Sequence, residues 1–349
     1  MKQFICLLTL CFAFGACSKE DIPQGKTVLE DIFAISDNPN DPIQHKRYQI
    51  YHTYNVPVYF NDTISTKEIG KDWYGNPVMH YETVDLNWEF DSYNTSLTYE
   101  YDYIETDEEK MNALLFVEKY LEVCSRSMRP FSIMLANGLT ASSPDAQLPQ
   151  NYFVGFRTLV LYDIAHITDN AEIISKSKTI INNMILQKVK TNDALCKKFE
   201  NVSSGFYWKE WAELKECSTV EEWHRKTYGN ANVNMLFHGA PYDNSTSWYG
   251  EVDFAEYLVA SGAVGDQEEA ENIRKRIVAE IGQYGFIKGA ERLYLSSPSN
   301  KDEDLAAYTL AIINMGKDTF TERFGNCPLV MQKFNLLYDY ITTTLEIEL

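Results

Sequence analysis

Five long stretches with apolar residues at helical spacing constrain the fold of this chain most. They lie at about 106–125, 171–189, 266–284, 301–315 and 328–345. In the second of them Ile174, Ile181, Ile185 and Val189 are expected to form the buried face. Prolines and glycines mark the borders of the last three, with starts at Pro298 and Pro328 and ends at Gly285 and Gly316. The second half of the chain is therefore expected to be mainly helical.

Strand patterns are confined to the first half. Bulky residues alternate over residues 48–60, where Pro57 favours an edge position. Short apolar runs at 131–135 and at 152–167, centred on 158–162, predict two more strands. Residues 61–105 are irregular and rich in Tyr, which is typical of a long loop or of additional hairpins. These patterns predict an α+β protein in which a small mixed sheet precedes a mainly helical half.

The first 16 residues have the features of a targeting signal and not those of a folded segment. Lys2 supplies a positive charge, residues 4–14 are apolar but too few to span a bilayer, and Gly15 and Ala16 precede Cys17. Phe-Gly-Ala-Cys resembles a bacterial lipoprotein cleavage box, which implies a signal peptide at 1–16 and acylation of Cys17. The alternative is an ordinary secretory signal with an incidental cysteine.

A tether is expected to follow the anchor. Residues 18–21, Ser-Lys-Glu-Asp, resemble the surface-export tag of Bacteroidetes lipoproteins. Residues 17–44 are predicted to be a tether with a short helix, and residues 45–349 a single domain. The expected location is the outer membrane, lipid-anchored at the cell surface.

Charge and cysteine content limit the possible partners and cross-links. The formal net charge of −19 opposes binding to nucleic acid. Outside the cytoplasm Cys124, Cys196, Cys217 and Cys327 could form two disulfides in three pairings, or remain four buried thiols. The sequence leaves both possibilities open.

Residues 236–260 form a polar, aromatic loop that leads into a predicted helix. Asp253 and Glu256 lie three residues apart and share one face of that helix. Such a pair suits a metal ligand or general base, but it equally suits solvated acids near a helix N-terminus. His238 and Asp243, in the preceding loop, are the other weak candidates for a ligand or a substrate contact.

Several segments together resemble the zinc-binding metallopeptidase lipoproteins of Bacteroidetes, of the gluzincin type. The likeness covers the strand Tyr-Asn-Val-Pro-Val-Tyr at 54–59, the loop Phe-His-Gly-Ala-Pro-Tyr at 237–242 and the helix Asp-Phe-Ala-Glu at 253–256. The family uses H-E-x-x-H on a helix, where two imidazoles bind zinc and the Glu acts as general base. The family's third zinc ligand is the first Glu of an E-D-F-A-E helix.

The zinc ligands of that family are missing here. In the matching positions stand Asn182 and Leu186 for the two histidines, Asn183 for the base and Val252 for the third ligand. Leu and Val cannot bind zinc, and an amide is a poor substitute for imidazole or carboxylate. The resemblance therefore implies a fold without catalytic residues, metal ligands or cofactor.

The expected function is that of a surface lipoprotein with a degenerate, non-catalytic metallopeptidase-like domain, a binding or accessory component. Its expected partners are the membrane, a peptide or glycan ligand, and outer-membrane proteins of nutrient uptake. One alternative is an active metallopeptidase with rearranged zinc ligands drawn from His238, Asp243, Asp253 and Glu256. The other is a glycan-binding lipoprotein of a polysaccharide-uptake system, in which Tyr and Trp stack on sugars.

Overall fold

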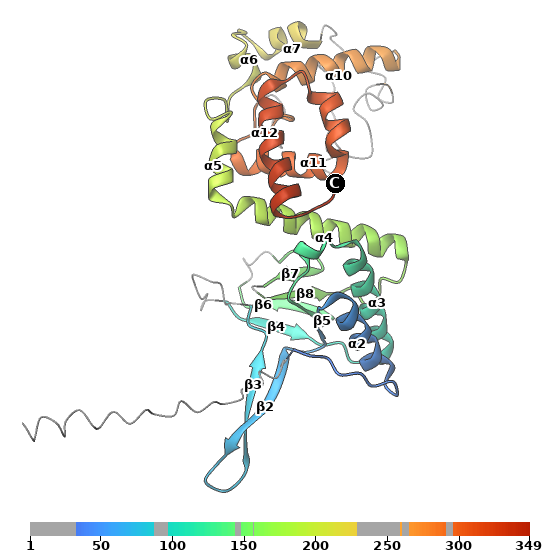
Figure 1. Cartoon of the computed structure of the whole chain (residues 1–349). Helices are drawn as coiled ribbons and strands as arrows, with labels where there is room; N and C mark the ends of the chain where they lie inside the picture. The colour runs from blue at the N-terminus through green and yellow to red at the C-terminus, as the bar shows by residue number, and fades with distance from the viewer. Residues whose placement is uncertain are drawn as a thin grey trace, which may run out of the picture. The chain divides into compact units, whose positions relative to one another are not determined.

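A small mixed sheet forms the first half of the fold in this computed structural model (Figure 1). The structure describes residues 33–86, 97–143, 148–155, 157–228, 259, 265–290 and 296–349. The sheet has the order β1-β5-β8-β7, with bounds Val58–Tyr59, Ser132–Ala136, Thr158–Tyr162 and Tyr152–Val154. Strands β1 and β8 run parallel to β5, and β7 runs antiparallel to β8. The prediction of an α+β fold is confirmed.

The strands predicted at 131–135 and 158–162 are confirmed, and both are fully buried or nearly so. The register pairs Ile133 with Leu159 and Val58 with Ile133. The longer strand predicted over 152–167 is two strands, β7 and β8, and it ends at Tyr162. Asp163, with a positive φ of 54°, turns the chain away from the sheet.

The strand predicted over residues 48–60 is mostly wrong. Residues Pro42–Tyr54 form helix α2, and only Val58–Tyr59 are a strand. Asp41 caps the helix by accepting hydrogen bonds from the backbone N–H groups of Ile43 and Gln44, and Pro42 occupies its first turn. Asn55 ends it in the left-handed conformation. The domain boundary predicted at residue 45 lies inside this helix, and of the short helix predicted before it the described residues 33–35 are not helical.

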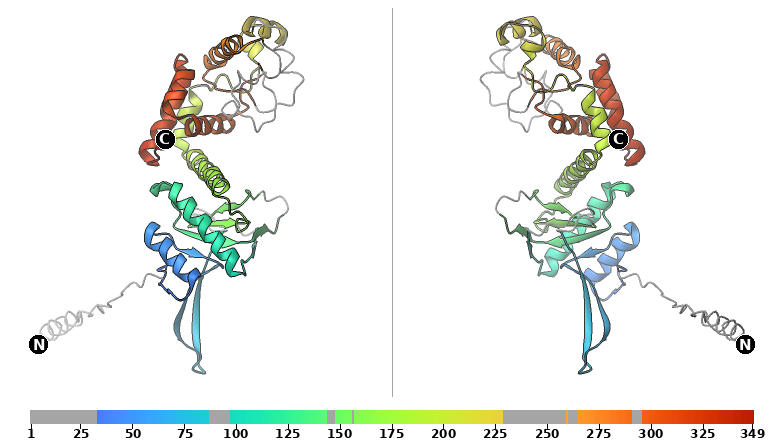
Figure 2. Two further views of the ribbon diagram at one scale, coloured as in Figure 1. Left: turned by 90° about the vertical axis from the view of Figure 1, so that its right-hand side faces the viewer. Right: turned by 90° about the vertical axis from the view of Figure 1, so that its left-hand side faces the viewer.

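Helix α3, Asp107–Val123, begins at a capping box as its sequence predicts. Thr106 Oγ1 accepts a hydrogen bond from the backbone N–H of Glu109 and donates one to the Glu109 carboxylate. The two views of Figure 2 show α2 and α3 against one face of the sheet. Leu114, Phe116 and Val117 of α3 lie in the same hydrophobic cluster as Ile133 and Leu159 of the sheet.

Helix α4, Asn170–Lys190, connects the sheet to the helices that follow. Asp169 caps it, and it packs against α3 and against α11. Its buried face includes Ile181, Ile185 and Val189 as predicted, but Ile173 is buried in place of Ile174, which is half-buried. The main hydrophobic cluster continues through α4 into the helical half.

The helical half consists of short and long helices around two hydrophobic clusters. The bounds are Asp193–Asn201 for α5, Trp211–Leu214 for α6, Val220–Tyr228 for α7, Gln267–Gly282 for α10, Lys301–Phe324 for α11 and Pro328–Asp339 for α12. A π-helical turn, Tyr340–Thr344, extends α12. The second cluster joins α6, α7 and α10 around Trp211 and Trp223.

Gly316 breaks helix α11 where the sequence predicts an end. Its φ of 68° and ψ of 174° are not helical, so α11 consists of two helical segments that meet at a kink at this residue. Phe320 and Phe324 beyond the kink are buried, and Phe320 stacks on Phe334 of α12 with ring centroids 4.4 Å apart. The end predicted at Gly316 is therefore confirmed, and the packing of the second segment explains why another helical stretch follows it.

Two sheets of two strands each complete the described structure. Strands β4, Tyr99–Asp102, and β6, Gly138–Ala141, pair antiparallel. Strands β2, Thr63–Lys71, and β3, Pro77–Thr83, form a sheet of their own. Residues 35–63 and 83–349 form one compact unit, whereas residues 64–82 of the β2–β3 hairpin belong to a second unit together with Phe33 and Ala34.

The four cysteines of the described chain are free thiols. Cys124, Cys196 and Cys327 are buried and Cys217 is half-buried. Burial raises the pKa of Cys124 to about 11. Among the described helices none is both long enough and apolar enough to cross a membrane.

Candidate functional site

The loop and helix singled out at residues 236–260 lie almost entirely outside the described residues. This applies to His238, Asp243, Asp253 and Glu256, and equally to Val252 and to the predicted lipidation site Cys17. Their arrangement stays a prediction. Within the described ranges, no group of three or more His, Cys, Asp and Glu side chains is placed to hold a metal ion.

The other half of the zinc resemblance lies on helix α4 and is described. Asn182, Asn183 and Leu186 are half-buried in the middle of this helix. Asn182 and Leu186 are four residues apart, one helical turn, which is the spacing of a zinc-binding histidine pair. Burial raises the pKa of Tyr152 in β7, and a hydrogen bond with the Asn183 side chain opposes that rise. Asn183 is thus a hydrogen-bond partner of a tyrosine of the sheet.

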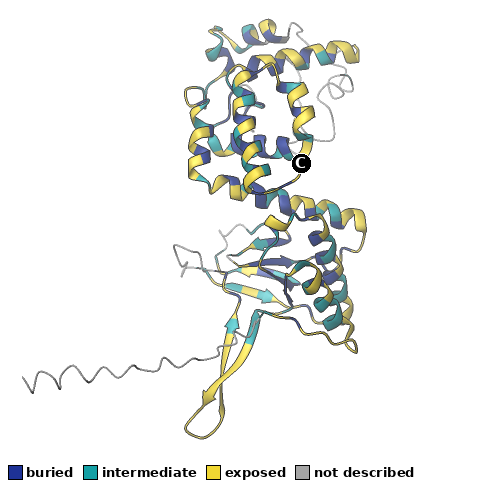
Figure 3. Ribbon diagram, viewed as in Figure 1, coloured by how far each residue is buried: buried dark blue, intermediate teal, exposed yellow. Residues whose placement is uncertain are grey.

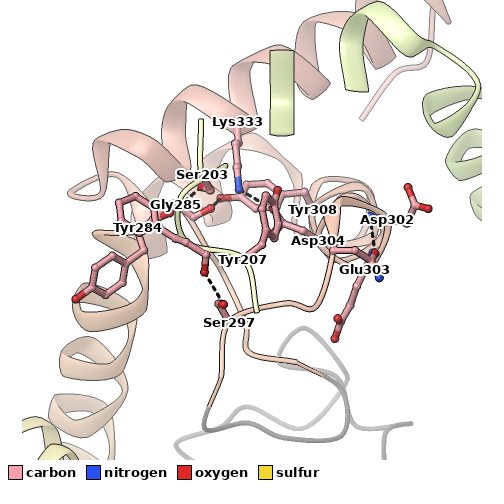
Figure 4. Close-up of polar contacts among 12 residues, drawn as sticks. Ser203, Tyr207, Tyr284, Gly285, Ser297, Asp302, Glu303, Asp304, Tyr308 and Lys333 are labelled. Atoms are coloured by element: carbon pink, nitrogen blue, oxygen red, sulfur yellow. Dashed lines mark hydrogen bonds and ion pairs between the residues drawn. The ribbon is translucent and has the colours of Figure 1, made fainter. Parts of the chain in front are cut away.

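The most densely connected polar group in the described structure is centred on Lys333 of α12 (Figure 4). Its Nζ lies 2.6 Å from Oδ2 of Asp304 in α11, and the two side chains are 0 % and 1 % exposed. Tyr207, which follows α5, donates a hydrogen bond from its hydroxyl to the same Oδ2 at 2.8 Å. The other oxygen of Asp304, Oδ1, has no hydrogen-bond partner in the described part of the chain.

Four aromatic rings surround the lysine ammonium group. Its Nζ lies 4.4 Å from the ring centre of Phe286, 4.7 Å from Phe199, 5.3 Å from Tyr207 and 5.6 Å from Tyr308. Ring faces attract a cation through their quadrupole, and more strongly where water is excluded. The cage therefore replaces part of the hydration that Lys333 loses on burial.

Neighbouring hydrogen bonds fix the loops that carry these rings. Ser203 donates to the carbonyl of Tyr284 at 2.7 Å, and Tyr308 donates to the carbonyl of Gly285 at 3.0 Å. Ser297 donates to the carbonyl of Phe206 at 2.6 Å. These contacts join the turn after α5, the end of α10 and the segment before α11 (Figure 4).

Burial and the attraction between the two charges shift the pKa of each member of the ion pair in opposite directions. Burial raises the pKa of Asp304, while Lys333 and the Tyr207 hydroxyl oppose that rise. Burial lowers the pKa of Lys333, and Asp304 opposes it. Burial also raises the pKa of Tyr207, with the Asp304 charge adding to it, so Tyr207 stays a hydrogen-bond donor. A pair closed to solvent on all sides holds α11, α12 and α5 together and does not contact a substrate.

The sequence analysis missed this cluster. The signal that could have found it is a lysine inside an apolar stripe, because Val330, Lys333, Phe334 and Leu337 follow one another at helical spacing on α12 and all are buried. Asp304 gave no signal, because it stands among first-turn acids that usually serve as solvated helix caps.

The described chain contains a basic crevice of about 300 Å³. It lies between α10, α11 and the start of α12, and Arg274, Lys275 and Arg323 contribute positive charge to it. Glu271 forms ion pairs with Arg274 and Lys275, and Arg323 helps to lower the Glu271 pKa. Glu271 and Glu322, which also lines the crevice, therefore offset two of these three positive charges.

Comparison of this chain with protein-family models, with curated proteins and with solved structures finds no match.

Proposed function

We propose that this chain is a lipid-anchored protein of the outer-membrane surface whose metallopeptidase-like domain binds a ligand and does not cleave it. One observation carries the proposal: Asn182 and Leu186 occupy one turn of helix α4 at the spacing of a zinc-binding pair, with Asn183 between them. An amide and an isobutyl group at these positions do not bind zinc. The Asn183 amide has no basic lone pair with which to take a proton from water.

The anchor is supported by the sequence Phe14-Gly-Ala-Cys17 and by the tether after it. Two or three acyl chains on Cys17 give stable attachment to a membrane, unlike a single chain. The ligand is a peptide or a glycan, and the expected partners are outer-membrane proteins of nutrient uptake. The net charge of −19 argues against nucleic acid as a ligand.

The metal part of the proposal is tested by rebuilding the site. The purified wild-type chain is expected to contain far less than one zinc per chain, and a chelator should leave its melting temperature unchanged. The double variant Asn182→His/Leu186→His should gain weak zinc binding, since two imidazoles one turn apart reach one ion. Adding Val252→Glu should tighten that binding, because the resemblance places residue 252 next to α4.

The control keeps the same third substitution but moves the pair. Asn183→His/Gln187→His, shifted by one residue along α4, turns the pair by about 100° around the helix axis and should gain nothing from Val252→Glu. Stoichiometric zinc in the wild type, lost on chelation together with a proteolytic activity, would favour the active enzyme with rearranged ligands. An equal effect of Val252→Glu on both pairs would remove the support that the resemblance gives.

The anchor is tested separately in cells. Cys17→Ala should release the chain from the membrane fraction or block its maturation, and should abolish labelling by palmitate. Labelling that persists in the variant would place the acyl chain elsewhere or assign the wild-type signal to another protein.

A further inference from the structure

The β2–β3 hairpin exposes apolar side chains to an unusual degree. Figure 3 shows most of its two strands as exposed. Of the large hydrophobic residues that are exposed in the described chain, six lie between residues 64 and 82: Ile69, Trp73, Tyr74, Val78, Met79 and Tyr81. A patch of apolar side chains on an isolated hairpin marks a surface for interaction, since the fold gains nothing from leaving it in water.

The tip of this hairpin is an ordered turn that presents two aromatic rings. The backbone N–H of Gly75 donates to the Asp72 carbonyl at 3.0 Å, and the N–H of Asp72 donates to the Asn76 carbonyl at 2.8 Å. Gly75 has a φ of 85°, so the turn is a three-residue loop with a left-handed glycine. Trp73 and Tyr74 occupy the loop and are 97 % and 86 % exposed.

The Asp72 carboxylate holds the turn in place. Its Oδ1 accepts hydrogen bonds from the backbone N–H groups of Tyr74 and Asn76, at 2.9 and 2.8 Å, and its Oδ2 accepts one from the Asn76 amide at 3.0 Å. The Asn76 bonds lower the pKa of Asp72, so the carboxylate stays ionised. The rings are therefore presented by a preorganised loop, and little order is lost when they meet a partner.

The hairpin carries little of the chain's negative charge, because residues 64–82 contain two lysines against three acids, Glu68, Asp72 and Glu82, a formal net charge of −1. The whole chain carries a net charge of −19, which an anionic surface repels. In β2, however, Lys67, Ile69 and Lys71 are each two residues apart, so they share one face of the strand. Lysine beside exposed apolar and aromatic side chains suits a phospholipid surface, where the ammonium groups meet phosphates and Trp and Tyr lie at the headgroup level.

The position of the chain's own tether points to the same partner. Phe33 and Ala34, where the described chain begins, belong to the compact unit of the hairpin. Fifteen residues, 18–32, separate them from Cys17, and a chain of this length spans at most about 50 Å when fully extended. An acylated Cys17 therefore keeps the hairpin unit close to the bilayer in which the acyl chains insert.

We infer that the tip of the β2–β3 hairpin is a second membrane contact, in which Trp73 and Tyr74 enter the headgroup region of the bilayer. This inference rests on the proposed lipid anchor. The acyl chains supply the attachment, and the hairpin tip fixes which part of the chain faces the membrane.

The test uses the full acylated chain, purified in detergent and reconstituted into phosphatidylcholine vesicles with brominated acyl chains. Bromine quenches tryptophan fluorescence only at close range. The Trp73 signal is the difference between the wild type and Trp73→Phe, and it should be shifted to shorter wavelength and quenched. Trp208, which is 63 % exposed in the other unit, provides the matched control. The difference between the wild type and Trp208→Phe should keep the emission of a ring in water.

The outcomes separate the hairpin contact from the anchor. Vesicle flotation first reports whether the chain is anchored at all. A chain that floats with the vesicles while its Trp73 signal stays unquenched refutes the hairpin contact and leaves the anchor intact. A chain that does not float refutes the anchor and, with it, the hairpin contact. Equal quenching of Trp73 and Trp208 would likewise refute a contact specific to the tip. Unchanged circular dichroism of both variants verifies that they are folded.

Discussion

The cluster around Lys333 and the β2–β3 hairpin depart from the ordinary distribution of side chains in opposite directions. The first buries a charged lysine and aspartate completely, and the second leaves Trp73 and Tyr74 almost fully in water. Around Lys333 the compensation is visible inside the chain, as an ion pair, a tyrosine hydroxyl and four rings. No comparable compensation surrounds Trp73 in the described residues. A buried charge is thus explained by its neighbours, whereas an exposed tryptophan on an ordered turn indicates a partner outside the chain.

The strongest way to break this comparison is to remove one partner of the buried pair. Lys333→Met leaves Asp304 buried without its counter-charge, and it should lower the free energy of unfolding by about 3–5 kcal/mol. The double variant Lys333→Met/Asp304→Asn should lose much less, because a neutral amide needs no counter-charge and still accepts the Tyr207 hydrogen bond. Urea denaturation at pH 7 measures both.

Acid should partly rescue the single variant. Burial raises the pKa of Asp304, and a carboxyl group whose folded pKa is raised stabilises the fold below its unfolded pKa. This contribution is lost as the pH rises through the folded pKa. The deficit of Lys333→Met relative to the double variant should therefore shrink as the pH falls toward about 4. A single variant as stable as the double variant at pH 7 would show that the pair carries no charge.

A smaller change at the same cluster tests the role of the tyrosine. Tyr207→Phe removes the hydroxyl that donates to Asp304 Oδ2 and keeps the ring beside Lys333. A hydrogen bond to a charged group contributes about 1.5–3 kcal/mol, so the unfolding free energy should fall by this amount. Tyr308→Phe is the matched control, because that hydroxyl donates to a neutral carbonyl, Gly285 O, and its loss should cost less. Equal losses in the two variants would mean that Asp304 is not ionised.

How far the sequence predicts the structure depends on how local each signal is. Thr106 and Glu109 are three residues apart, so their capping box could be read directly and α3 is where it was expected. Asp41 and Pro42 carry an equally local signal for the start of α2, whereas the alternation of bulky residues over 48–60 predicts a strand of which the structure has only Val58–Tyr59. At Gly316 the local signal for an end is confirmed by the break in α11, and burial of Phe320 and Phe324 explains the helical segment beyond it.

The ion pair could not be predicted because its partners are far apart in the sequence. Asp304 and Lys333 belong to different helices, and only the packing of α11 on α12 brings them together. The hairpin tip was easier to predict from the sequence. Residues 61–105 could be a loop or hairpins by composition, and Asp72, Gly75 and Asn76 are the residues that a tight turn needs. That its rings remain exposed follows from the three-dimensional structure alone.

Cys124 is another buried ionisable group. Unlike Lys333, it has no hydrogen-bond partner of opposite charge among the described residues. Burial raises its pKa from 9.0 to about 11, so the folded chain holds the thiol proton more tightly than the unfolded chain. The resulting stability is fully present below pH 9 and is lost as the pH rises toward 11. At pH 10 the loss should be about 1 kcal/mol.

The measurement is the difference in alkaline stability between the wild type and Cys124→Ala. Other groups titrate between pH 8 and 11 as well, and subtracting the variant removes their common contribution. The wild type should lose stability more steeply than the variant over this range. Parallel curves would show that the thiol titrates alike in both states.

The smallest effect is expected where the apolar side chain is most exposed. Trp73→Ala removes a ring that is 97 % exposed, so it should change the unfolding free energy by less than about 0.5 kcal/mol in solution. Asp72→Ala, one residue earlier, should cost more, because it removes the hydrogen bonds to Tyr74 and Asn76 that hold the turn. If the ring serves a partner and not the fold, Trp73→Ala should weaken membrane contact while leaving the melting temperature in detergent unchanged. A clear loss of stability from Trp73→Ala would instead make Trp73 part of the fold, and the contrast with Lys333 would then disappear.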